Sequence, residues 1–211
     1  MRFRILALST GALAAALVLA GCAPTDGSMP GMDHGPGGMT SSTPAPSEQA
    51  SFNSADEMFV TMMIPHHEQA IEMADQILAK DGIDERVVTL AEQIKAAQGP
   101  EIQTMKGWLE DWGIPYDDSM SDMGGMGGMG GMDHGDGMMS DDDMAALDAA
   151  TGVEATRLFL EGMVGHHQGA VTMAQMVLNN GEYPDVAALA QQIIDGQTAE
   201  ITTMQDILAT L

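Results

Sequence analysis

Two groups of histidine and methionine side chains are the residues of this chain most suited to binding a metal. In each group, a pair of adjacent histidines has one methionine three residues before its first histidine and another seven residues after it. The groups are Met63, His66, His67 and Met73, and Met163, His166, His167 and Met173. Imidazole with thioether suits copper, because methionine sulfur favours Cu(I) and imidazole binds either Cu(I) or Cu(II).

Other metal sites fit these residues less well. Structural zinc prefers cysteine thiolates, and Cys22 is the single cysteine. A di-iron site needs inward glutamates and Glu-x-x-His pairs, which EMFVTMMIPHHE and its second copy lack. Calcium would need an EF-hand loop, and the sequence has no such pattern. The alternative is a metal-free core with space-filling methionines, which fits Met73 and Met173 taken alone. Two His-His pairs at equivalent places favour a metal instead.

The spacing of apolar residues predicts that the first group lies on a helix. Over residues 59–77, core-type residues recur at alternating steps of four and three, which places them on one stripe of a helix. Ser54 and Glu57 have the spacing of a capping box at its start. Asp81-Gly82 is a suitable end.

Proline and glycine residues are expected to bend, weaken or end the predicted helices. A second helix is expected from about Asp84 to residues 113–115, with a kink at residues 99–100. In the first helix, Pro65 lacks the backbone donor and crowds the preceding turn, so we expect a bend directly before the histidines. Gly165 occupies the matching position in the second group and also weakens a helix. Such a bend can turn ligands inward, or it can be a packing accommodation only.

The two halves of the helical part are copies of each other. Residues 63–78 (MIPHHEQAIEMADQIL) align without a gap with residues 163–178 (MVGHHQGAVTMAQMVL), and the matches LAEQI/LAQQI and EIQTM/EITTM follow in order. Gly181 and Pro184 mark the turn of the second copy, and residues 144–149 predict a short extra helix. Two hairpins with short loops predict an all-α antiparallel four-helix bundle over residues 52–211.

Residues 1–22 have the pattern of a bacterial lipoprotein signal peptide. A positive start precedes an apolar run, and the closing LAGC resembles a lipobox whose cysteine, Cys22, is lipidated after cleavage. The alternative is an uncleaved membrane anchor, for which the apolar run is short. Residues 23–51 are rich in Gly, Pro, Ser, Thr and Met, and they predict a disordered tether.

A Met- and Gly-rich insert, residues 117–144, interrupts the predicted bundle. Its methionines recur every third residue with glycines between them, so that several thioethers can wrap one soft ion. The candidate ligands of this accessory capture segment are Met126, Met129, Met132 and His134. The alternatives are a linker without a ligand role and a segment that buffers methionine oxidation.

The chain is strongly acidic, with 31 Asp and Glu residues against 7 Lys and Arg residues and a formal net charge of −24. This charge argues against nucleic acid or an anionic lipid surface as a partner, and it favours attraction of cations. A solvated acidic surface has the same composition, so the charge does not by itself identify a cation site.

The motifs MIPHHEQAIEMA and LEGMVGHHQGAVTMA, each followed by EI-x-x-M, resemble the bacterial domain-of-unknown-function family numbered three hundred and five, which includes CopM-type copper-binding proteins. The resemblance covers residues 52–211 apart from the insert. It implies a ferritin-like four-helix bundle, an extracytoplasmic location and a role in copper binding and tolerance. Matched position by position, the resemblance implies that the residues of both His-His-x5-Met groups, and the methionine that precedes each group, are metal ligands. It adds Met105 and Met204 from the later motif.

The second copy departs from the family pattern at two positions. Gly165 stands where the family usually has proline. Thr156 stands where an aspartate is common, and the first copy has that aspartate as Asp56. We therefore expect the second site to be looser or weaker than the first.

These observations predict an extracytoplasmic, lipid-anchored protein that binds copper, preferring Cu(I) and also accepting Cu(II), for sequestration, tolerance or transfer. Its partners would be metal ions, a bacterial membrane through Cys22, and a protein that receives copper. One alternative is a metal-free helical module of the envelope with a structural or interaction role. The other is a metal-dependent oxidase, which is disfavoured because the chain lacks a blue-copper cysteine, a Glu-x-x-His pair and a Ser/His/Asp arrangement. We expect no enzymatic activity.

Overall fold

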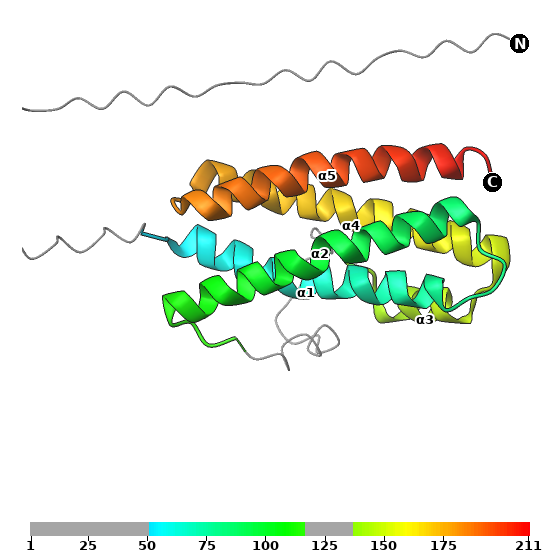
Figure 1. Ribbon diagram of the computed structural model, residues 1–211, viewed down its shortest axis with the longest axis horizontal. Helices are drawn as coiled ribbons and strands as arrows, with labels where there is room; N and C mark the ends of the chain where they lie inside the picture. The colour runs from blue at the N-terminus through cyan, green and yellow to red at the C-terminus, as the bar shows by residue number, and fades with distance from the viewer. Residues whose placement is uncertain (1–50, 117–136) are drawn as a thin grey trace, which may run out of the picture. The chain divides into compact units, whose positions relative to one another are not determined.

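The computed structural model describes residues 51–116 and 137–211, and within these ranges the chain is all-helical, with five helices and no strand. Four helices are long and one is short (Figure 1). They are α1 (Ser54–Leu78), α2 (Glu85–Trp112), α3 (Asp141–Ala149), α4 (Gly152–Asn180) and α5 (Pro184–Leu208). Among these helices, none combines the length and the apolar character needed to cross a membrane.

The N-cap of helix α1 lies one residue earlier than the sequence predicted. The N-cap is Asn53, whose side-chain oxygen accepts from the backbone N–H groups of Ala55 and Asp56. The Asp56 carboxylate accepts in return from the Asn53 backbone N–H at 2.9 Å, which completes a capping box. The predicted Ser54 and Glu57 pair is therefore wrong, because Asn53 and Asp56 have the same spacing and supply both oxygens.

The other helix ends agree closely with the local signals. Asp84 is the N-cap of α2, and Gly113, with a φ of 71°, ends α2 in the left-handed conformation that glycine adopts without strain. The α4–α5 turn lies between Asn180 and Pro184, as predicted. Helix α1 ends at Leu78, a few residues before the expected Asp81-Gly82. Both long helices of the first hairpin run without interruption through their internal prolines, Pro65 and Pro100.

The short helix α3 begins three residues before the predicted extra helix. Ser140 caps it by accepting from the Asp143 backbone N–H, and Met144 and Leu147 are its buried residues. Residues 137–144, the last part of the insert predicted at residues 117–144, thus belong to the described structure, and residues 141–144 are helical. Ser140 provides the start signal, because its hydroxyl satisfies an otherwise unpaired first-turn N–H.

The long helices form two hairpins that meet through α1 and α4. Helix α1 contacts α2, α4 contacts α5, and α1 contacts α4, whereas α2 and α5 contact each other much less. The start of α1 meets the end of α4, because the Asn53 side chain donates to the Asn180 carbonyl at 2.8 Å. Asp56 also accepts from the backbone N–H groups of Glu182 and Tyr183. Helices α1 and α4 are therefore antiparallel, and their middle turns face each other.

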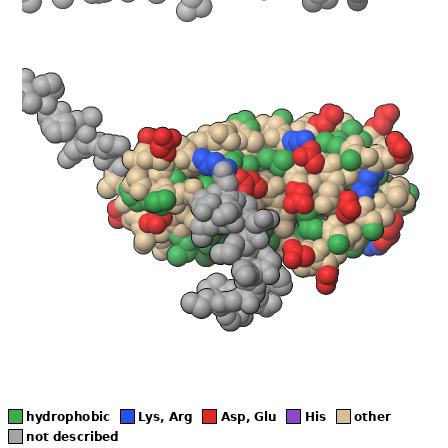
Figure 2. Space-filling model, turned by 90° about the horizontal axis from the view of Figure 1, so that it is seen from below, with side chains coloured by type: hydrophobic (Ala, Val, Ile, Leu, Met, Phe, Trp, Pro, Cys, Tyr) green, Lys and Arg blue, Asp and Glu red, His purple; other side chains and the backbone are tan. Residues whose placement is uncertain are grey.

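Acidic side chains are scattered over the face shown in Figure 2, with few basic side chains among them. The histidines of α1 and α4 are buried. The face shown thus has the acidic character expected from the composition, whereas the histidines lie in the interior.

Candidate metal centre

The two histidine pairs meet at the contact between α1 and α4. The rings of His66 and His166 lie with their centroids 3.7 Å apart and their planes at 38°. Within each pair, the adjacent histidine, His67 or His167, lies 6.4 Å or 6.3 Å away from its neighbour. All four side chains are at most 1% exposed. The structure therefore gathers four imidazoles from two distant parts of the chain into one dry region.

Each outer histidine is held by a glutamate from the partner helix of its own hairpin. His67 Nε2 lies 2.7 Å from a carboxylate oxygen of Glu101 on α2, and His167 Nε2 lies 2.6 Å from one of Glu200 on α5. An Nε2–H that donates to a carboxylate leaves the lone pair on Nδ1. The Nδ1 atoms of both histidines are buried and have no hydrogen-bond partner in the described part of the chain.

This arrangement is the one that metal-bound histidines commonly show. A ligating imidazole usually donates its second N–H to a carboxylate, which fixes the tautomer and makes the free nitrogen a better ligand. A buried acceptor without a partner is costly, because it has lost water and gained nothing in return. Two such Nδ1 atoms at matching positions therefore fit a bound cation.

His166 is held in the neutral form by its surroundings. Burial is the largest cause of its lowered pKa, because the charged imidazolium loses its hydration. Repulsion from His66, His167 and His67 lowers the pKa of His166 further. Neither ring nitrogen of His166 makes a hydrogen bond of good geometry to a described residue. Neutral imidazole is the form that binds metal, so the site keeps His166 in its ligand form.

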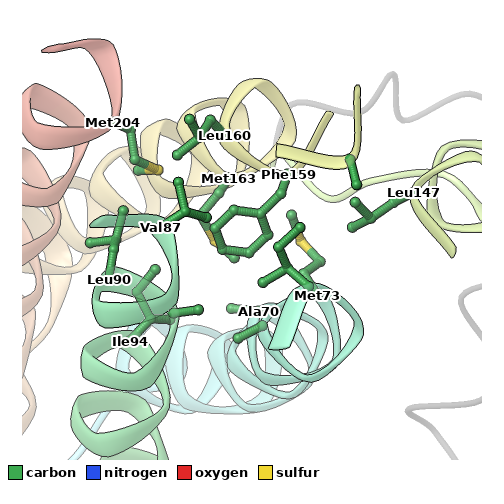
Figure 3. Packing of buried hydrophobic residues seen from close by; sticks show 14 of the residues in the cluster. Ala70, Met73, Val87, Leu90, Ile94, Leu147, Phe159, Leu160, Met163 and Met204 are labelled. Carbon is green, nitrogen blue, oxygen red and sulfur yellow. The ribbon is translucent and has the colours of Figure 1, made fainter. Parts of the chain in front are cut away.

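The motif methionines divide into two clusters that each draw on both hairpins. Met73 shares one cluster with Met163 and Met204, as Figure 3 shows around the ring of Phe159. Met63, Met105 and Met173 lie in the other cluster. All six are at most 5% exposed. Each cluster combines methionines of the two hairpins because the antiparallel contact places the second half of α1 against the first half of α4.

The donors gathered at the centre are thus imidazoles, with thioethers in the adjoining core. Within residues 51–116 and 137–211, no group of three or more His, Cys, Asp or Glu side chains is arranged to hold a metal. Imidazole and thioether together suit Cu(I) and accept Cu(II) through nitrogen. The accessory residues Met126, Met129, Met132 and His134, and the lipidation site Cys22 with its leader, lie outside the described residues.

Sequence reasoning missed the two glutamates. Glu101 and Glu200 open the repeated EI-x-x-M motif, and their recurrence in both copies at one turn before Met105 and Met204 was an available signal. The same helices bury Gln98 and Gln197, each three residues before its glutamate. A polar residue that is repeated on the buried side of a helix is informative, because burial without a partner is unfavourable.

Asp56 has a structural role that is separate from the histidines. It lies ten residues before His66, which corresponds to about 15 Å along a helix. Its carboxylate caps α1 and binds the α4–α5 turn. Thr156, at the matching position, instead donates its hydroxyl to the Gly152 carbonyl. The aspartate-to-threonine difference therefore concerns the ends of helices and gives no reason for a looser second site.

Comparison with known proteins places the chain in a family. The sequence profile described as Domain of unknown function (DUF305) matches residues 56–208. A DUF305 fragment from Deinococcus radiodurans is 31% identical, with a TM-score of 0.62 over 75% of this chain and 98% of the fragment. A DUF305 protein from Streptomyces coelicolor that is named as secreted is 32% identical, with a TM-score of 0.63 over 74% of this chain and 91% of the other.

The solved structures also include CopM in metal-bound forms. CopM in its Cu(II)-bound form is 34% identical, with a TM-score of 0.60 over 74% of this chain and 96% of CopM, and Cu(I)-bound and Ag-bound forms are similar as well. An uncharacterized protein of Acanthamoeba polyphaga mimivirus is 40% identical over 50 residues, which are 24% of this chain and 33% of that protein. The chain thus spans about a third of the curated relative that it matches. On the family profile and these structures together, the chain belongs to the DUF305 family.

Proposed function

We propose that this protein binds copper at the meeting of its two histidine pairs, preferring Cu(I) and also accepting Cu(II). The observation that carries the proposal is the gathering of four buried imidazoles, two of them oriented by Glu101 and Glu200 through Nε2. Similarity to CopM, whose solved forms contain Cu(I), Cu(II) or Ag, supports the choice of metal. The four long helices then form a ferritin-like bundle that arose by duplication of one hairpin.

The buried centre would hold the ion through nitrogen, with sulfur close by. His67 and His167 would offer Nδ1, and His66 and His166 would offer the imidazoles at the α1–α4 contact. The flanking thioethers would come from the two methionine clusters, {Met73, Met163, Met204} and {Met63, Met105, Met173}. Burial favours Cu(I) over Cu(II), because a smaller charge costs less to remove from water, and thioethers favour the same state.

Electrostatics and the flanking segments would bring the ion to this centre. The net charge of −24 attracts cations to the surface. Met126, Met129, Met132 and His134 of the insert would capture ions before they enter the bundle. Lipidation of Cys22 would keep the protein at an extracytoplasmic membrane surface, where it would sequester copper or pass it to a partner. This role needs no enzymatic step.

The test is an anaerobic titration of residues 23–211 with Cu(I) against a competing chelator, with Cu(II) and Zn(II) in parallel. The double variant His66→Leu/His166→Leu is compared with Thr156→Val, which also replaces a buried polar side chain but lies near the start of α4. Circular dichroism checks that each variant keeps its helices.

We expect tight Cu(I) binding with weak Zn(II) binding, and loss of at least one equivalent of Cu(I) in the histidine variant only. Copper should also raise the melting temperature, because a ligand that binds the folded state stabilises it. Equal binding by the histidine variant would move the site elsewhere. Absence of any binding that competes with the chelator would leave a metal-free helical module.

A further inference from the structure

A surface groove between α1 and α4 is lined by four methionines. It has a volume of about 270 Å³ and lies where the first half of α1 faces the last turns of α4. The methionines are Met58 and Met62 from α1 and Met173 and Met176 from α4. Met58 and Met62 are one helical turn apart, as are Met173 and Met176, so each helix presents two sulfurs on one side.

Three of these methionines are unusually exposed. Met58 is 63% exposed, Met62 is 43% exposed and Met176 is 55% exposed. The described residues include six exposed large hydrophobic side chains, and half of them are these three methionines. Single exposed apolar side chains are ordinary, but a group of one chemical type around one groove is informative. Met173, at 5% exposed, connects the groove to the buried cluster with Met63 and Met105.

The opposite end of the α1–α4 contact provides an internal comparison, because the duplicated sequence makes a matching groove there. The residues there are Leu158, Gly162, Met73 and Gln76, in the places of Met58, Met62, Met173 and Met176. That groove is filled by the segment before α4. A Cβ at Gly162 would lie 2.5 Å from the Met139 sulfur, and Met144 and Leu147 of α3 share a cluster with Met73.

The segment that fills the matching groove is held firmly in place. The Gln69 side chain donates to the Met139 carbonyl at 2.9 Å and accepts from the Met139 backbone N–H at 2.8 Å. On the open side, the residue in the place of Gln69 is Gly169, which has no side chain to make such a clasp. On the side that no other described segment covers, methionine therefore stands where the filled side has leucine, glycine and glutamine.

We propose that the open groove is a second soft-metal site, which binds a monovalent ion such as Cu(I) or Ag(I) through the thioethers of Met58, Met62, Met173 and Met176. Thioether sulfur is neutral and polarizable, and the flexible methionine side chain can adjust to a soft ion from several directions. Oxygen-preferring ions such as Ca²⁺ and Mg²⁺ find no suitable ligands in this set. Because Met173 belongs to both regions, the groove is an entry point to the buried centre.

The choice of probe ions rests on the proposed function, but the site does not depend on the histidines. The experiment titrates the full chain with Ag(I) and, anaerobically, with Cu(I). The test variant is Met58→Leu/Met62→Leu/Met176→Leu, because leucine has nearly the volume of methionine but no sulfur. The matched control is Met144→Leu, which removes a sulfur from the filled groove. Methyl-labelled methionine NMR reports which sulfurs contact the ion.

We expect the triple variant to bind one equivalent of Ag(I) or Cu(I) fewer than the unaltered chain, with an unchanged melting temperature without metal. Met144→Leu should bind the full number. In the unaltered chain, the methyl signals of Met58, Met62 and Met176 should shift on addition of Ag(I). Unchanged stoichiometry together with unshifted methyl signals would overturn the proposal.

The same titration separates this site from the buried centre. The variant His66→Leu/His166→Leu should lose its own equivalent and keep the methyl shifts of the groove. Loss in the triple variant alone would support the groove and contradict the histidine centre. Loss in the histidine variant alone would support the centre and contradict the groove.

Discussion

His66 of α1 and His166 of α4 face each other with their ring centroids 3.7 Å apart, at the middle of the contact that joins the two hairpins. Two buried imidazoles at this distance cannot both be charged without strong repulsion. The two histidines therefore belong both to the contact between the hairpins and to the candidate metal centre. Protonation of either histidine would affect the stability of the contact and the binding of metal.

The lowered pKa of His166 predicts that stability falls in mild acid. Above about pH 6.5, His166 is neutral in both the folded and the unfolded chain. Between about pH 6.5 and its lowered folded-state pKa, only the unfolded chain takes up the proton. The free energy of unfolding should therefore decrease as the pH falls, by up to about 1.4 kcal/mol per pH unit.

The measurement is urea unfolding between pH 7.5 and pH 5.5 in the presence of a chelator, for the unaltered chain and for His166→Leu. The variant lacks the titrating group, so its free energy of unfolding should depend less steeply on pH. Equal slopes for the two proteins would contradict the neutral state of His166.

The glutamates predict an effect on metal affinity that acts through the histidines. Glu101→Gln and Glu200→Gln keep the side-chain shape but remove the carboxylate that orients His67 or His167. Loss of such an outer partner typically weakens metal binding about 10–100-fold. We expect a loss of this size in each variant, measured by competition with a Cu(I) chelator.

The matched control for the glutamates is Glu92→Gln, an exposed position on α2 with the same change of charge. It should leave the affinity unchanged. If it weakens binding as much as Glu101→Gln does, then the general acidic field explains the effect and the specific contact does not.

Two neighbouring glycines predict opposite changes in stability. Gly137 has a φ of 76°, and a Cβ there would overlap the Gly165 carbonyl oxygen, so Gly137→Ala should destabilise the protein by about 1–3 kcal/mol. Gly165 is helical, and no atom beyond its own helical turns lies within 4 Å of an added Cβ. Gly165→Ala should therefore stabilise it by up to about 1 kcal/mol. Urea unfolding checks both, and a neutral Gly137→Ala would show that residues 137–140 do not lie against α4.

Asp56 predicts a loss of stability without a loss of copper. Asp56→Ala removes an acceptor of three backbone N–H groups, from Asn53, Glu182 and Tyr183. The expected cost is about 2–4 kcal/mol, because a helix cap is lost and partly buried donors lose their partner. Copper stoichiometry below the melting temperature should not change. A variant that keeps its stability but loses copper would link Asp56 to the metal site after all.

Much of the local structure follows from the sequence alone. The starts and ends of α2 and the α4–α5 turn follow from Asp84, Gly113 and Pro184, because capping and turn preferences act over a few residues. The placement of the α1 cap at Asn53 could not be told from Ser54, because both are good caps with a suitable acidic residue three positions later. The types and spacing of the histidines and methionines also predict soft-metal chemistry before any packing is known.

The tertiary structure decided how these residues meet. The antiparallel contact of α1 and α4 faces His66 with His166, exchanges the methionines between hairpins, and brings Glu101 and Glu200 to the outer histidines. The two ends of the α1–α4 contact also differ, because residues 137–149 fill one groove, whereas no other described segment fills the methionine-lined groove. Helical periodicity fixes which side of each helix is apolar, whereas the partner of that side depends on contacts between residues far apart in the chain.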